Sequence, residues 1–325
     1  MSPRPRALRG ILAAAVRAIL ASRAHAHDYW LVPAELVVPG DRDVAVSLFV
    51  GEDFVSDEEK PFEPPRYPRL SLLHAGRVQD LAGAAVAGAR PLLRLPLRGE
   101  GGHLLVVDRN ASRIELEPRK FEAYLAHEGL GAVIRERARL GESDKPGRER
   151  YSRYLKALVQ VGRVRDETYG ASIGQRIELV PEVNPVFLEP GAELPVVVRF
   201  AGEPLAGAKL EAFSRDGADI RGASYTTDVA GRVRVAIDRR GVWLLRLTHM
   251  VRCQDCSDAD WESCWTSYTF ASADPSGSVV AAPSMFAPSS PRFGILRIVA
   301  VLAGAAVLAA GGYLFLRRRR RLDRR

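Results

Sequence analysis

Two candidate metal ligands, His27 and Asp28, follow the tripeptide Ala24-His25-Ala26. Cleavage after Ala26 would give His27 a free α-amine beside its imidazole, a chelating pair that suits Cu(II), Ni(II) or Co(II). Asp28 can add a carboxylate oxygen. The alternative is that His27 is an exposed residue that merely follows a cleavage site. We treat His27 and Asp28 as candidate metal ligands.

A second group of candidate ligands surrounds His249, at the end of the apolar run 242–250. Met250 and several acidic residues follow at once, so imidazole, thioether and carboxylate groups lie close together in the sequence. A histidine at the end of a strand can equally be a packed residue with no ligand. His127, in a segment with helical spacing, is a further candidate. The acidic residues are Asp255, Asp258, Asp260 and Glu262.

The three cysteines, Cys253, Cys256 and Cys264, allow one disulfide and leave one thiol over. A bridge within Cys-x-x-Cys is tight and reducible, so we favour a disulfide from Cys264 to one of the other two. A tetrahedral zinc site that includes His249 is the alternative, although one Cys-x-x-Cys unit with a distant cysteine is a weaker signal than two such units.

Gly-Ala-Ser-Ile-Gly at 170–174 matches the letters of a nucleophile elbow around Ser172. That elbow needs a strand before it, a helix after it and a parallel sheet around it. The neighbouring pattern offers none of these, so the stretch is interpreted as a linker. The sequence therefore predicts no enzyme.

The two ends of the chain carry targeting signals. Residues 1–26 combine arginines, a short apolar run and a small-residue end, as a secretory signal peptide does, and an uncleaved amphipathic leader is the alternative. Residues 294–316 contain an uncharged stretch long enough to cross a bilayer as one helix. The arginine-rich tail 317–325 predicts a cytoplasmic C-terminus. A single-pass protein of the cell membrane with a periplasmic body follows, and residues 271–293, rich in Pro, Ser and Ala, are the predicted linker.

The formal net charge of +8 is concentrated in those ends. Residues 1–23 hold five arginines and no acid, and residues 317–325 hold seven arginines and one aspartate, which leaves the rest of the chain with a net charge of −3. A nucleic-acid-binding protein needs its basic surplus on the folded surface. We therefore expect no nucleic-acid partner.

Short β-branched and aromatic runs separated by turn residues predict a mainly β fold with two β-sandwich domains. The first covers residues 27–174 and includes a short helical insertion within about 118–161, where apolar residues recur at helical spacing. The second covers residues 175–270, in which six or seven short strands predict an immunoglobulin-like sandwich.

The opening HDYWLVPAELVVPGDRDVAVSLFVGEDF and later blocks such as YSRYLKALVQVG and TTDVAGRVRVAIDRRGVWLLRLTHM resemble the DUF4198 family of bacterial periplasmic proteins. The resemblance covers most of residues 27–270. It implies a link to nickel and cobalt uptake systems, with a metal-transport permease as partner. The cysteine cluster and the arginine-rich C-terminus depart from the commoner pattern, so the metal and its ligands stay open.

The sequence as a whole predicts a membrane-anchored periplasmic protein that binds a divalent transition metal, nickel, cobalt or copper, as an accessory to its uptake or handling. The alternative is a non-catalytic structural or protein-interaction ectodomain in which the histidines are incidental.

Overall fold

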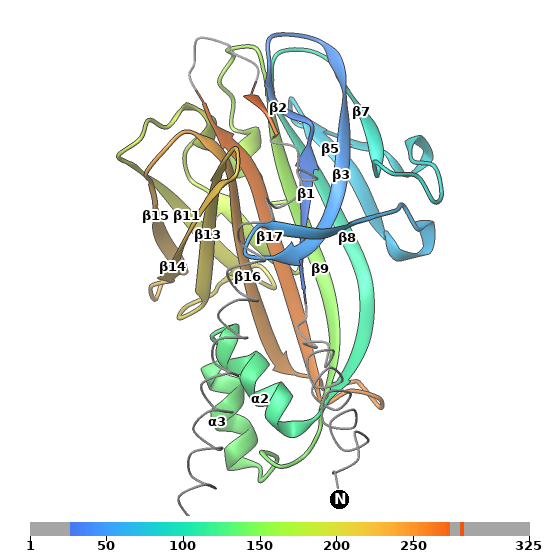
Figure 1. Ribbon diagram of the computed structural model, residues 1–325, viewed down its shortest axis with the longest axis vertical. Coiled ribbons are helices and arrows are strands. Elements are labelled where there is room, and N and C mark those ends of the chain that lie inside the picture. The colour runs from blue at the N-terminus through green and yellow to red at the C-terminus, as the bar shows by residue number, and fades with distance from the viewer. Residues whose placement is uncertain (1–26, 274–279, 283–325) are drawn as a thin grey trace, which may run out of the picture. The chain divides into compact units, whose positions relative to one another are not determined.

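The computed structural model of this chain describes residues 27–273 and 280–282 (Figure 1). The predicted signal peptide 1–26, the predicted transmembrane helix 294–316 and the tail 317–325 lie outside the described residues. Among the residues that are described, no helix is long and apolar enough to cross a membrane.

The described residues are mainly β and contain one large sheet with ten strands. Eight of them follow one another in the order β14, β13, β16, β17, β9, β8, β5, β6, and β2 and β18 pair beside β9. Their bounds are β14 Asp219–Thr226, β13 Lys209–Asp216, β16 Gly241–Arg252, β17 Trp261–Ser272, β9 Gly147–Val161, β8 Gly101–Leu116, β5 Arg69–His74, β6 Arg77–Asp80, β2 Glu35–Val38 and β18 Val280–Ala281.

A smaller sheet of β1 (Asp28–Pro33), β3 (Arg42–Glu52), β4 (Val55–Lys60) and β7 (Leu93–Leu97) packs on one part of the large sheet. Leu31 and Val46 on the small sheet belong to the same apolar cluster as Leu105 on β8 and Leu155 on β9. Burial of such side chains contributes about 1.5–3 kcal/mol each, so this cluster stabilises the N-terminal half.

A second smaller sheet consists of β10 (Ile177–Pro181), β11 (Ala192–Phe200), β12 (Glu203–Pro204) and β15 (Arg232–Ile237). Buried and exposed residues alternate strictly along β15, as expected for a strand with one face toward a core. β10 contacts β17 of the large sheet. The strands are joined in places by the 3₁₀ turns η1 Pro64–Arg66, η2 Ala82–Ala84, η3 Thr168–Gly170 and η4 Pro185–Phe187.

The large sheet crosses the boundary predicted between residues 174 and 175. β17 pairs in parallel with β9, so strands from both predicted domains share one hydrogen-bonded ladder. The predicted boundary therefore falls between the two smaller sheets, but the large sheet is continuous across it.

Two helices, α2 (Pro118–His127) and α3 (Gly131–Arg139), connect β8 to β9 (Figure 1). Their buried side chains Phe121, Leu125 and Val133 pack against Trp261 and Trp265 of β17. The helices lie within the segment predicted from helical spacing, but the prediction was wrong for residues 147–161, which form β9. All of residues 155–161 are buried, so both faces of that strand are covered and its apolar residues carry no period-2 signal.

The predicted linker 271–293 also needs a correction in its described part. Residues 271 and 272 end β17, and residues 280 and 281 form β18, where Val280 pairs with Val37 of β2. The Pro- and Ser-rich composition of the segment did not reveal that residues 280 and 281 add a short strand to the large sheet.

Candidate functional site

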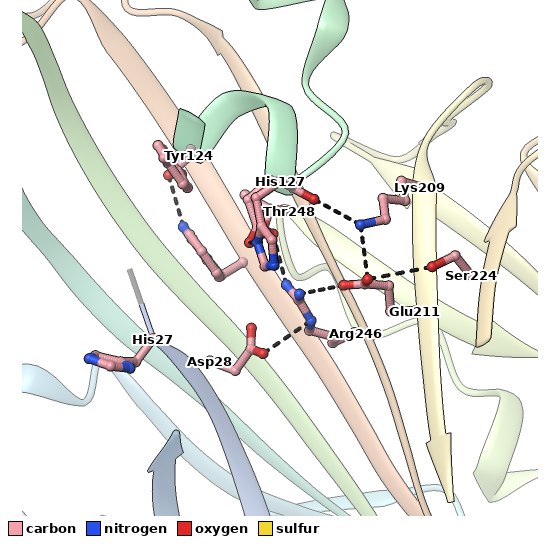
Figure 2. Close-up of polar contacts among 12 residues, drawn as sticks. His27, Asp28, Tyr124, His127, Lys209, Glu211, Ser224, Arg246 and Thr248 are labelled. Carbon is pink, nitrogen blue, oxygen red and sulfur yellow. Dashed lines mark hydrogen bonds and ion pairs between the residues drawn. The ribbon is translucent and has the colours of Figure 1, made fainter. Parts of the chain in front are cut away.

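A buried guanidinium lies at the centre of a charged cluster where β1, β13, β16 and the end of α2 meet (Figure 2). Arg246 on β16 is only 3% exposed. Its Nε lies 3.0 Å from Asp28 Oδ2 as an ion pair that is not aligned as a hydrogen bond, and its Nη1 donates to Glu128 Oε2 at 2.7 Å. Its Nη2 forms an ion pair with Glu211. One cation is thus shared by three carboxyl groups.

Two of those carboxyl groups have further partners. His127 Nδ1 lies 3.0 Å from Glu128 Oε1, and Thr248 donates its hydroxyl to Glu128 Oε2 at 2.9 Å. Lys209 Nζ lies 2.9 Å from Glu211 Oε1 and also donates to the His127 carbonyl. Among the described residues, Asp28 makes an ion pair with Arg246 alone.

The electrostatics follow from this sharing. Burial raises the pKa of Asp28 to about 7, against the attraction of Arg246. Burial also opposes ionisation of Glu128, but the His127 hydrogen bond and the charge of Arg246 outweigh it and hold the pKa of Glu128 below its ordinary value. Its hydrogen bond with Glu128 raises the pKa of His127. Asp28 is the carboxyl group with the fewest partners, so a proton on Asp28 relieves the repulsion among the three carboxyl groups.

His27, immediately before Asp28, lies at the rim of a neighbouring pocket of about 240 Å³. Its Nδ1 lies 3.7 Å from Asp57 Oδ2, and both side chains are open to solvent. Arg153 lies inside the pocket, with its guanidinium 3.9 Å from the centre of the Tyr29 ring, and it donates to the His27 carbonyl. An exposed imidazole and an exposed carboxylate therefore lie close together in a pocket that Arg153 and Tyr29 also line.

An imidazole nitrogen and a carboxylate oxygen are suitable ligands for a divalent transition metal. Nowhere in residues 27–273 and 280–282 do three or more His, Cys, Asp or Glu side chains form a group that could hold a metal. His27 and Asp57 supply two donors, so a third must come from elsewhere.

His249 faces the other side of the large sheet. Side chains alternate along a strand, so His249 points away from the face that carries Arg246 and Thr248. Its ring packs edge-on against Phe200, with the ring centroids 4.5 Å apart, and burial lowers the pKa of His249 to about 4. The structure therefore does not bring His249 together with His27, whereas it does bring Asp28 and His127 into one cluster.

The cysteines pair differently from the preferred prediction. Cys253 and Cys256 form the disulfide, and Cys264 is a free, buried thiol on β17. The prediction of a bridge to Cys264 was wrong because Cys264 lies within a paired strand opposite His249, while the other two cysteines lie in the loop between β16 and β17. Burial raises the pKa of Cys264 to about 12. The alternative zinc site would need two thiols that are joined to each other here.

The sequence interpretation missed Asp57, Glu128, Glu211 and Arg246. Glu128 directly follows His127 and so had a weak local signal, whereas Asp57 begins an acidic run of three residues that nothing in the sequence ties to His27. Glu211 and Arg246 had no local signal, because residues far apart in the chain meet only through the sheet.

Comparison with models of protein families gives one match. A family model described as "Domain of unknown function (DUF4198)" matches residues 24–251, which is more than half of the chain. No curated protein matches the chain.

Proposed function

This chain belongs to the DUF4198 family, and we propose that it binds a divalent transition metal at His27. The metal binds outside the cytoplasm, and the protein performs no catalysis. The metal is nickel, cobalt or copper. The protein is anchored to the cell membrane by residues 294–316 and serves a metal-transport permease as an accessory.

The observation that carries this proposal is the juxtaposition of His27 and Asp57. A metal held at about 2.0–2.2 Å by each of two ligand atoms keeps those atoms about 3–4 Å apart. The 3.7 Å between His27 Nδ1 and Asp57 Oδ2 falls in that range without rearrangement. Both groups are exposed, so a hydrated ion can reach them.

The third ligand in this proposal is the α-amine that cleavage after Ala26 would create. The amine and imidazole of one residue form a chelate, and Asp57 then completes three donors. His127 is excluded from this set because its Nδ1 is engaged by Glu128, and Asp28 is excluded because its carboxyl group is buried against Arg246.

The test is a calorimetric titration of the mature protein, with His27 as its first residue, with Ni(II), Co(II) and Cu(II). We expect one ion per chain. One extra N-terminal alanine and Asp57→Asn should each weaken binding at least about tenfold, since each removes a ligand or its geometry. Asp144→Asn, a matched change at an exposed aspartate in the loop after α3, should leave binding unchanged, as should His249→Gln.

Absent binding, or binding that ignores both the extra residue and Asp57→Asn, would contradict the proposal. A non-catalytic protein-interaction ectodomain would then be the better account of the chain.

A further inference from the structure

A second pocket, of about 410 Å³, lies on the face of the large sheet opposite His27. Glu149 of β9 points toward α2, where it accepts from Tyr124, so the next residue, Arg150, points to the other face. Arg150 lines this pocket together with Arg176 and the Cys253–Cys256 disulfide. None of the residues of the proposed metal site lines this pocket.

Most arginines around this pocket are already paired with a carboxylate. Arg176 Nη2 lies 2.7 Å from Glu262 Oε2. Arg252 makes a two-pronged contact with Glu142, at 2.8 and 3.2 Å. The charges of these two guanidinium groups are offset within the protein.

Arg150 differs from its neighbours. Within the described residues it forms no ion pair, and its buried Nε has no hydrogen-bond partner. Its Nη1 reaches only the Cys256 sulfur, at 3.9 Å, which is a weak acceptor. A buried hydrogen-bond donor on a charged group destabilises the protein when it has no acceptor. An anion bound in the pocket would supply the acceptor that the Arg150 guanidinium lacks, and the pocket has room for one.

We propose that this pocket binds a small oxyanion, a phosphate or a carboxylate, through Arg150. The planar guanidinium presents two parallel N–H groups that match the oxygens of such an anion. The disulfide closes the short loop that forms one wall of the pocket, and Asp255, between the two cysteines, also lines it. The negative charge of Asp255 opposes the anion and limits its affinity.

The experiment titrates the full-length protein with inorganic phosphate and, separately, with succinate, by calorimetry and without added metal. We expect one of the two anions to bind at one site per chain. Arg150→Gln should weaken that binding at least about tenfold, because a charge-assisted hydrogen-bonding pair is lost. Arg234→Gln, at an exposed arginine on β15 that pairs with Glu193, is the matched control and should have no effect.

The variant Asp255→Asn distinguishes loss of the anion site from loss of the folded structure. Removing the opposing charge should tighten binding severalfold, a gain that misfolding cannot produce. Saturation that differs between phosphate and succinate identifies the class of the anion. Failure of both anions to bind, binding by Arg150→Gln equal to that of the unchanged protein, or no gain in Asp255→Asn would overturn the proposal.

Discussion

Replacement of Arg246 by methionine removes the cation that three carboxyl groups share, two of which, those of Asp28 and Glu128, are buried. Asp28 and Glu128 are each only 6% exposed, so neither can recover its hydration by turning toward solvent. We expect the free energy of unfolding to fall, because a buried charge that loses its partner is strongly destabilising.

The magnitude follows from what each carboxyl group keeps. Glu128 retains His127 and Thr248, and Glu211 retains Lys209, so those two stay partly compensated. Asp28 keeps no ion-pair partner among the described residues, but with a pKa already raised to about 7 it can take up a proton, so the loss falls mainly on Glu128 and Glu211. Breaking a buried pair costs about 3–5 kcal/mol, and the remaining partners place this variant at the lower end, about 3 kcal/mol.

The assay is urea unfolding followed by tryptophan fluorescence, since all four tryptophans, Trp30, Trp243, Trp261 and Trp265, are buried. Arg234→Met, at an exposed arginine, is the control and should change stability by no more than about 0.5 kcal/mol. Adding Asp28→Asn to Arg246→Met should recover at least about 1 kcal/mol, because it removes a buried carboxyl group that folding must otherwise protonate. A loss in Arg246→Met as small as that of Arg234→Met would refute the idea that the cluster depends on its central cation.

Two further predictions concern how α2 is held against the sheet. Burial raises the pKa of Glu149 from its ordinary 4.5 to about 6. The protonated side chain therefore contributes fully to the free energy of unfolding below pH 4.5, and this contribution is lost as the pH rises through 6. Glu149→Gln should abolish this loss of stability with pH. The difference in unfolding free energy between the two proteins should therefore shift by about 2 kcal/mol between pH 4 and pH 7 in urea unfolding, and parallel pH curves would contradict this. A side chain at Gly147 would collide with the Phe121 ring, so Gly147→Ala should lower stability by about 1–3 kcal/mol in the same assay. Gly40→Ala, where a Cβ meets nothing within 4 Å, should cost no more than about 0.5 kcal/mol, and equal losses in the two variants would be inconsistent with the collision.

The sequence predicted best those strands that have one face in water. Along β15 the arginines at 232 and 234 alternate with buried Val233 and Val235, and such alternation is legible without a structure. β9 was misread because its first residues are mostly polar and its last residues are all buried. A strand inside a large sheet that is covered on both faces has no pattern of its own to distinguish it from a helix.

The candidate site was predictable only where its residues are neighbours in the chain. His27 and Asp28 were visible because they follow a predicted cleavage site, and His127 because it lies in a segment with helical spacing. Arg246 reads as an ordinary residue of an apolar strand, and its three carboxyl partners come from other elements. The disulfide was misassigned for a related reason, since the pairing of three cysteines depends on which of them the sheet holds apart.

The buried cluster and the exposed pair are linked through the first residues of β1. Asp28 is held from one side by Arg246 and pairs in register with Gly51 of β3, while Arg153 holds the His27 carbonyl. An imidazole on a loose terminus would lose much conformational freedom on binding an ion, and that loss weakens binding. Because the backbone at His27 is already fixed by groups that are themselves buried, most of this ordering is complete before a ligand arrives. In the proposed metal site, the charged cluster would therefore affect affinity without touching the metal, because it sets where His27 lies relative to Asp57.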